Sequence, residues 1–220
     1  MDSRTFVIGD IHGCYQTLVA LLGAIDPDPG NDTLLFLGDY IDRGPHSNQV
    51  VEEILGLRKK YRRLITLKGN HEHMLLCYLA GKEIDFYLSA GGQETLQSYG
   101  AIPPLDDPSQ LRLPKEHYFF FQELLNYWED GNYIYVHAGL QPGIHLTQQN
   151  LAWLLWAREN FINLKSNFGK KVIYGHTPFT VPKVDENKIG IDTGAVYGGG
   201  LTCLILPEER LVTVPTCDEV

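Results

Sequence analysis

Five short apolar runs in this chain end in the same way, and this recurrence limits the folds that the sequence can adopt. Each run passes into a mixture of Asp, Asn and His, usually beside a glycine that lets the backbone turn sharply. The runs, with the polar residues that follow them, are 6–8 with Asp10 and His12, 34–37 with Asp39 and Asp42, 64–67 with Asn70 and His71, 133–136 with His137, and 172–174 with His176. Open α/β folds place their ligands at the carboxyl ends of buried strands. We therefore predict an α/β fold in which these five endings lie near one another.

The segments between and after these runs predict the remaining elements. Apolar residues recur at helical spacing in five stretches, which are 15–25, 50–61, 74–80, 115–127 and a segment from residue 151 that carries Arg158. Past His176 the pattern becomes strand after strand, at 183–184, 188–191, 201–206 and 210–214. Alternating runs followed by hairpins predict two sheets in a single domain that spans residues 1–220.

The stretch 81–114 interrupts this pattern. Its periodicity fades, and the pairs Gly91-Gly92 and Pro103-Pro104 appear in it. We interpret it as an insertion with short helices, because long irregular segments inside a compact domain usually have a function. It is expected to lie over the site and to contribute to the choice of substrate.

Composition excludes several classes of protein. The chain has 220 residues, of which 44% are apolar and 20% charged, so it can bury a large core. A net charge of −9 argues against binding to nucleic acid or to an anionic membrane, since both require a basic surface. No apolar run approaches the ~20 residues of a membrane span, and we expect no signal peptide. The four cysteines form no CxxC pair, which favours reduced thiols in a cytoplasmic protein.

The polar endings contain enough ligands for two metal ions. Asp10 and His12 leave the first run together, and Asp39 can reach the same point from the neighbouring strand. The set is completed by Asn70, His137 and His176. A mixed oxygen and nitrogen set of this size exceeds one tetrahedral zinc site but suits two divalent ions that share a carboxylate. Because no thiolate is present, the set favours manganese, iron or zinc in a catalytic centre.

Such a centre predicts hydrolysis of a phosphate ester. Two cations roughly 3.5–4 Å apart can deprotonate a bridging water and hold the resulting hydroxide in line with a phosphorus atom. Arg43 and Arg158 add positive charge, which suits a phosphomonoester dianion and its transition state. His71 is the candidate general acid for the leaving group, because its neighbour Asn70 lies at the metal. Asp42 can bind the other ring nitrogen of His71 and fix its tautomer.

These motifs carry a family resemblance. In order and spacing, the segments 9–13, 38–44, 69–72, 137–139 and 174–177 resemble the metal-dependent phosphoprotein phosphatases of the metallophosphoesterase superfamily. The chain length and the run Trp156-Ala157-Arg158 are most similar to the small bacterial and bacteriophage lambda type. The resemblance implies a metallophosphoesterase fold, with two facing mixed β-sheets flanked by helices. It also implies a single calcineurin-like domain.

The resemblance further implies a role for each matched residue. It assigns one metal to Asp10, His12 and Asp39, and the other to Asp39, Asn70, His137 and His176. It makes His71 the general acid supported by Asp42. It assigns the substrate phosphate to Arg43, Arg158 and Asn70. Manganese is the cofactor that the bacterial relatives usually use.

Departures from the related families limit how far the resemblance extends. The C-terminal loop of the eukaryotic phosphatases is absent, and residues 191–199 stand in its place. The related diadenosine tetraphosphatases typically have Gln where His12 stands and lack the pair Asp42-Arg43. These two differences from the tetraphosphatases, at His12 and at Asp42-Arg43, favour phosphoester cleavage over dinucleotide cleavage.

We therefore predict a cytoplasmic serine/threonine protein phosphatase with activity on phosphotyrosine, acting as a monomer on phosphoproteins or small phosphoesters. One alternative is hydrolysis of dinucleoside polyphosphates or cyclic nucleotides by the same two-metal centre. A second is a binding domain built on a decayed centre, which the intact ligand set disfavours. Glu72 is expected to support the first turn of the helix that follows it. Tyr197 is expected to pack in its glycine-rich turn.

Overall fold

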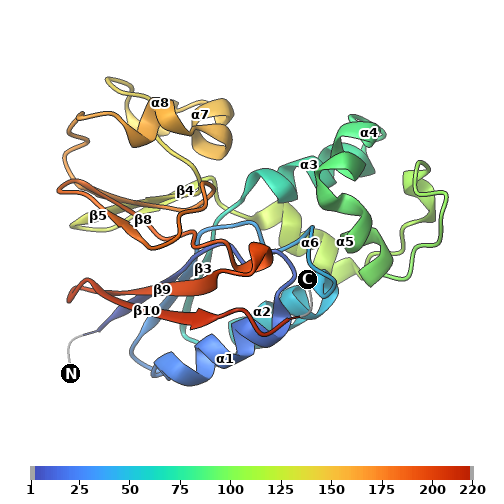
Figure 1. Ribbon diagram of the computed structural model, residues 1–220, viewed down its shortest axis with the longest axis horizontal. Coiled ribbons are helices and arrows are strands. Elements are labelled where there is room, and N and C mark those ends of the chain that lie inside the picture. Colours follow the sequence, from blue (N-terminus) through green and yellow to red (C-terminus); the bar gives the residue numbers. More distant parts are fainter. Residues whose placement is uncertain (1–2, 219–220) are drawn as a thin grey trace.

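The computed structural model describes residues 3–218 and arranges the strands in two sheets that face each other (Figure 1). The first sheet has the order β10-β9-β1-β2-β3 and the second has the order β4-β5-β6-β8-β7. The strands of the first sheet are β1 (Thr5–Ile8), β2 (Thr33–Phe36), β3 (Arg63–Thr66), β9 (Gly200–Leu206) and β10 (Arg210–Pro215). Those of the second sheet are β4 (Tyr127–Glu129), β5 (Tyr133–Val136), β6 (Lys171–Tyr174), β7 (Lys183–Val184) and β8 (Lys188–Gly190).

Both sheets are mixed. In the first sheet β1, β2 and β3 are parallel, whereas β9 runs antiparallel to β1 and to β10. In the second sheet β5, β6 and β8 are parallel, and β4 and β7 are antiparallel at the two edges. Parallel strands end at the same edge of a sheet, so the polar residues that follow β1, β2 and β3 emerge side by side. The predicted fold of two facing mixed sheets flanked by helices is confirmed.

Helices cover the outer faces of both sheets (Figure 1). The helices α1 (Tyr15–Ile25) and α2 (Ser47–Lys60) lie against the first sheet, and α7 (Leu151–Trp156) and α8 (Glu159–Ile162) lie against the second. The remaining helices, on one flank, are α3 (Asn70–Leu79), α4 (Ile84–Tyr87), α5 (Gln93–Ser98) and α6 (Lys115–Glu123). None of the helices within residues 3–218 combines the length and the apolar character needed to cross a membrane.

The apolar core follows the alternation of side chains along each strand. Val7 and Leu35 point between the sheets and meet Ile173 and Ile189 of the second sheet. Their neighbour Phe6 points the other way, into the layer that α1 and α2 cover. Because successive side chains of a strand face opposite sides, strands that are buried on both faces must be apolar throughout. This explains why the runs in the sequence are continuous.

Three predicted helix boundaries are wrong. The helix predicted at 74–80 begins at Asn70, so Asn70 and His71 lie in its first turn. The helix predicted at 115–127 ends at Glu123, because Tyr127 pairs with Val136 in the second sheet. The helix from residue 151 ends at Trp156, so Arg158 lies after it, where the backbone leaves helical geometry before α8 begins.

The stretch 81–114 contains the short helices that were predicted. The helices α4 and α5 are joined by Leu88–Gly92, where the chain kinks at Gly91 with a positive φ angle. This stretch contacts the loop that follows β2, because the Arg43 N–H donates a hydrogen bond of 2.9 Å to the carbonyl of Gly91.

Asp32 ties the start of β2 to the start of β1. Its carboxylate accepts hydrogen bonds from the guanidinium of Arg4 at 2.7 Å and from the backbone N–H of Asp28 at 2.9 Å. Burial alone would raise the pKa of Asp32, but these donors outweigh it and hold the pKa below its usual value. A carboxylate with a depressed pKa stabilises the fold above its unfolded pKa, and that stabilisation is lost as pH falls through the folded pKa.

We expect Asp32→Asn to lower the free energy of unfolding by about 1–3 kcal/mol at pH 7, since charged hydrogen bonds are lost. The deficit should shrink below pH ~4, where the wild-type carboxyl loses its charge as well. Urea unfolding of both proteins at pH 7 and pH 3 measures this. An equal deficit at the two pH values would show that the ion pair does not stabilise the fold.

Candidate metal centre

The polar residues that follow the five strands are buried. All six predicted metal ligands are at most 6% exposed. Three of them, His12, Asp39 and His176, have positive φ angles, as do the neighbouring Asp42 and Arg43. In the described part of the chain these five are the majority of the non-glycine residues with positive φ. Such backbone conformations are unfavourable for side chains with a Cβ, and they cluster where a site demands them.

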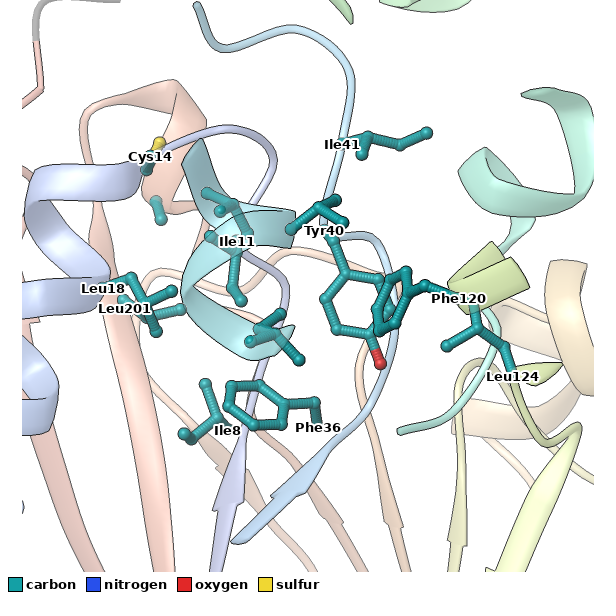
Figure 2. Close-up of a cluster of buried hydrophobic side chains, with 14 of the residues drawn as sticks. Ile8, Ile11, Cys14, Leu18, Phe36, Tyr40, Ile41, Phe120, Leu124 and Leu201 are labelled. Atoms are coloured by element: carbon teal, nitrogen blue, oxygen red, sulfur yellow. The ribbon is translucent and has the colours of Figure 1, made fainter. Parts of the chain in front are cut away.

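The buried ring of Tyr40 anchors the loop that carries Asp39. The ring packs against Phe120 of α6, with ring centroids 5.4 Å apart (Figure 2). Its hydroxyl donates a hydrogen bond of 2.7 Å to the carbonyl of Leu67. The position of the loop between β2 and α2 is therefore set by contacts with both β3 and α6.

Two groups of three side chains share the carboxylate of Asp39. In each group the candidate donor atoms lie within 4.8 Å of one another. The first group, here called triad 1, is His12, Asp39 and His71, and the second, triad 2, is Asp39, His137 and His176. Asp39 Oδ2 lies 3.4 Å from Nε2 of both His12 and His137. This is the arrangement that two divalent ions with a common carboxylate require.

Backbone carbonyl groups orient two of the histidines. Nδ1 of His12 donates to the carbonyl of Ile41 at 2.8 Å, and Nδ1 of His137 donates to the carbonyl of Leu37 at 3.1 Å. Since a carbonyl oxygen only accepts, these contacts place the proton on Nδ1 of a neutral ring and leave Nε2 with a lone pair. Both Nε2 atoms face Asp39. A hydrogen bond to the far nitrogen is the usual way of orienting a histidine ligand.

The charge states of the site suit cation binding. Burial lowers the pKa of His12 and His137, and it lowers that of His176 to about 3, so the three rings are neutral near pH 7. Burial would raise the pKa of Asp39, but the surrounding histidines outweigh it and keep the pKa well below its usual value. Metal ligands must be neutral imidazoles and ionised carboxylates.

Two atoms of this region have no hydrogen-bond partner within the described residues. They are Oδ1 of Asp10 and Nε2 of His176, and both are buried. Oδ2 of Asp10 accepts a hydrogen bond of 2.9 Å from the backbone N–H of His176, so the two residues adjoin. Buried polar atoms are nearly always satisfied, and a cation would satisfy both of these. The residues present therefore fit a pair of divalent ions.

Asp10 and Asn70 lie beside the triads and are not members of them. Asp10 adjoins triad 2 through His176, and burial together with the charges of Asp192 and Asp39 raises its pKa well above the usual value. Asn70 Oδ1 lies 3.0 Å from Nε2 of His137. All six predicted ligands are thus linked, although triad 1 contains His71 where the prediction had Asp10.

His71 and Asp42 form a buried pair. Nδ1 of His71 lies 2.7 Å from Oδ2 of Asp42, and the other carboxylate oxygen accepts hydrogen bonds from the hydroxyls of Tyr87 and Thr95. Burial lowers the pKa of His71, but Asp39 and Asp42 outweigh it, so the pKa is raised above its usual value. Since Nδ1 is paired with Asp42, Nε2 is the nitrogen that His71 can offer to His12 and Asp39, the other members of triad 1. The predicted contact between the two residues is therefore present.

One arginine lies near each triad. The guanidinium of Arg43 lies 2.7 Å from Nε2 of His12 and covers the ring of Tyr197, whose centroid is 5.5 Å away. Arg158 is exposed and makes no side-chain hydrogen bond in the described part of the chain, but its charge contributes to the lowered pKa of His176. The two arginines among the predicted phosphate-binding residues therefore lie near different histidines, Arg43 near His12 and Arg158 near His176.

A model of the calcineurin-like phosphoesterase family matches residues 3–205. The chain belongs to this family. Its members are phosphoesterases that use divalent metal ions, in agreement with the two triads. The predicted superfamily is thus confirmed.

Two curated relatives carry a more specific name than the family does. Bis(5'-nucleosyl)-tetraphosphatase PrpE [asymmetrical] of Geobacillus sp. (strain WCH70) is 29% identical over 96% of this chain and 93% of its own length. The protein of the same name from Bacillus thuringiensis (strain Al Hakam) is 28% identical over the same shares. These names differ from the lambda-type protein phosphatase that the motifs suggested.

Solved structures share the fold. A protein provisionally described as a diadenosine tetraphosphatase superposes with a TM-score of 0.75 at 23% identity, covering 98% of this chain and 95% of its own. A cold-active protein tyrosine phosphatase gives a TM-score of 0.70 at 16% identity, covering 97% and 80%. At these identities the similarity supports the phosphoesterase fold alone.

Glu72 has a larger role in the phosphoesterase site than the sequence indicated. Its carboxylate accepts hydrogen bonds from the N–H groups of Gly69 (2.9 Å), Asp39 (3.0 Å) and Tyr40 (2.8 Å). The bond to Gly69 is the predicted support of the helix start, whereas the other two join the ends of β2 and β3. Burial, with the charge of Asp39, raises the pKa of Glu72 to about 8. A Cβ at Gly69 would collide with the Asp39 carboxylate, so glycine permits this close approach.

Asp192 is a buried carboxylate of the phosphoesterase site that the prediction did not include. It follows β8 as Asp39 follows β2, and its charge contributes to the raised pKa of Asp10. Burial raises its own pKa to about 6. The sequence did contain a signal for Asp192, because the segment 188–191 was predicted as a strand and the carboxylate follows it directly.

Proposed function

We propose that this phosphoesterase hydrolyses dinucleoside polyphosphates, with diadenosine tetraphosphate as a representative substrate. Two triads that share one carboxylate support the chemistry, because two adjacent cations are suited to cleaving a P–O bond. The observation that carries the choice of substrate is the name of the relatives, which match nearly the whole chain and are tetraphosphatases. This places the predicted alternative ahead of protein dephosphorylation.

The proposed ligand sets follow the resemblance. One cation would be held by Asp10, His12 and Asp39, and the other by Asp39, Asn70, His137 and His176. When bound, the cations would lower the pKa of a water molecule and polarise a phosphoryl oxygen. His71 is left out of the ligand set because the resemblance makes it the general acid, with Asp42 on its other ring nitrogen.

The other residues bind the phosphates and move a proton. Arg43 and Arg158 would each hold phosphoryl oxygens, and two arginines near different triads suit a substrate with several phosphates in a row. Asn70 would donate to the phosphate under attack. As the P–O bond breaks, Nε2–H of His71 would donate its proton to the leaving oxygen, and Asp42 would stabilise the imidazolium beforehand.

Hydrolysis of phosphomonoesters, including those of phosphoproteins, is the second candidate. The buried His71–Asp42 pair is the observation that favours it. An alkoxide such as a serine side chain is a poor leaving group and depends strongly on a general acid, whereas a nucleotide phosphate leaves more readily.

A substrate comparison tests the proposal. With Mn²⁺ supplied, we expect kcat/KM for diadenosine tetraphosphate to exceed that for phosphoserine, phosphothreonine and phosphotyrosine peptides by about tenfold or more, which is about 1.4 kcal/mol in transition-state binding. Chromatography should identify AMP and ATP as products, the asymmetric cleavage that the relatives' name describes. A higher kcat/KM on any of the phosphopeptides would favour the second candidate.

A further inference from the structure

Two exposed aromatic rings meet beside triad 2. Phe86, on α4, is 51% exposed, and Trp156, at the end of α7, is 38% exposed. Their ring centroids are 6.1 Å apart, with an angle of 40° between the ring planes. The centroid of Trp156 also lies 6.3 Å from that of His176. We call Phe86 and Trp156 the aromatic platform.

The packing of the core does not explain this exposure. Tyr87 and Leu155, the neighbours of the two platform residues in the sequence, are fully buried and hold α4 and α7 in place. The platform residues face outward from two segments that are far apart in the chain. Large apolar rings that are left in solvent beside a polar site commonly mark a surface for an apolar part of a ligand.

The platform lies close to the groups that are expected to bind phosphate. Trp156 contacts His176 of triad 2 and precedes Arg158 by two residues. A ligand with a phosphate at triad 2 would therefore have its adjoining group near the two rings. Tyr197 is also exposed, at 62%, but it differs from the platform residues because the guanidinium of Arg43 lies over its ring, 5.5 Å from the centroid.

We propose that the aromatic platform binds a purine base of the substrate by stacking. This inference rests on the proposed function and names the part of the molecule that recognises the nucleoside. Nucleotides join a flat aromatic ring to anionic phosphates, which matches a pair of exposed rings beside an arginine and a metal-binding triad. Base stacking on aromatic side chains contributes to binding for every base, because each base has a π face. A phosphoserine peptide offers no planar group at the corresponding position.

Competition by AMP and by inorganic phosphate separates binding of the base from binding of the phosphate. The reporter reaction is the hydrolysis of β-glycerophosphate with Mn²⁺ supplied. This substrate contains no aromatic group. We expect Trp156→Ala and Phe86→Ala to raise the Ki of AMP about 5- to 100-fold, the range that stacking of one base covers. In the same variants, the fold-rise in the Ki of inorganic phosphate should be at least about five times smaller than the fold-rise in the Ki of AMP. Trp156→Phe should recover most of the affinity for AMP.

The chain offers matched controls. Trp128 on β4 is 41% exposed and lines a surface hollow with Arg62 and Leu64, and Phe119 on α6 is 54% exposed. Trp128→Ala and Phe119→Ala remove side chains of the same two types at similar exposure, and these variants should leave both Ki values unchanged. Equal rises in the Ki of AMP and of phosphate in the platform variants would overturn the proposal. So would a rise in the Ki of AMP in the controls.

These measurements, together with an assay on diadenosine tetraphosphate, distinguish failure of the platform proposal from failure of the proposed function. If the wild type does not cleave diadenosine tetraphosphate but the platform variants lose AMP selectively, the platform is supported and the proposed function fails. If the wild type cleaves diadenosine tetraphosphate while the platform variants keep its KM and the Ki of AMP, the platform is wrong and the proposed function remains.

Discussion

Asp39→Asn should remove both metal ions and lower phosphoesterase activity about 10³-fold or more. Asp39 is the residue common to the two triads, so its charge is expected to act on both ions. Cations stabilise the transition state by several kcal/mol, and each 1.4 kcal/mol changes the rate tenfold. Asn has almost the shape of Asp and tolerates the positive φ of 50° at this position, so the backbone should remain in place.

Metal binding can be followed without an activity assay. Titration of the wild-type protein with Mn²⁺ should raise its Tm, because a ligand that binds only the folded state stabilises it. In Asp39→Asn this rise should be nearly lost, and metal analysis should find less than one ion per chain. Asp32→Asn is the matched control, since it neutralises a buried carboxylate away from the site and should keep the full metal response. Two ions per chain in Asp39→Asn would disprove the shared role.

The five strand endings could be predicted from sequence because each combines a continuous apolar run with a ligand residue. The run predicts a strand that is buried on both faces, and parallel strands bring their carboxyl ends together. Asp192 was missed although it follows β8 in the same way. The segment of β8 begins with a charged residue, Lys188, which is buried because its ammonium donates to the carbonyls of Phe161, Ile162 and Leu164.

Some contacts between distant segments could not be predicted. The hydrogen bonds from Asp39 and Tyr40 to Glu72 join the ends of two strands, and no local pattern marks them. The contact of Phe86 with Trp156 likewise depends on how α4 and α7 are placed. Local motifs predict which bond is cleaved, whereas the group attached to the phosphate is recognised by residues outside them. For this reason the features at His12 and Asp42 favoured a different class of substrate from the one that the names of the relatives support.

His71→Asn should reduce hydrolysis of esters with poor leaving groups about 10²- to 10⁴-fold, the usual contribution of a general acid. The loss should be much smaller for p-nitrophenyl phosphate, whose leaving group needs no proton. β-Glycerophosphate, which releases an alkoxide, is the matched poor substrate. His73→Asn, on the same helix but outside both triads, is the control variant and should retain both activities. Equal losses on the two substrates would indicate that His71 binds metal and is not the acid.

The pH dependence provides a second test of the same role. Asp39 and Asp42 raise the pKa of His71, so the acid form persists above its usual range and is lost as pH rises through the raised value. The rate on β-glycerophosphate should therefore fall on the alkaline side of its pH profile. Asp42→Asn removes one of the two negative charges and should move this fall to lower pH. An alkaline limb that stays in place in Asp42→Asn would mean that another group, such as a metal-bound ligand, controls it.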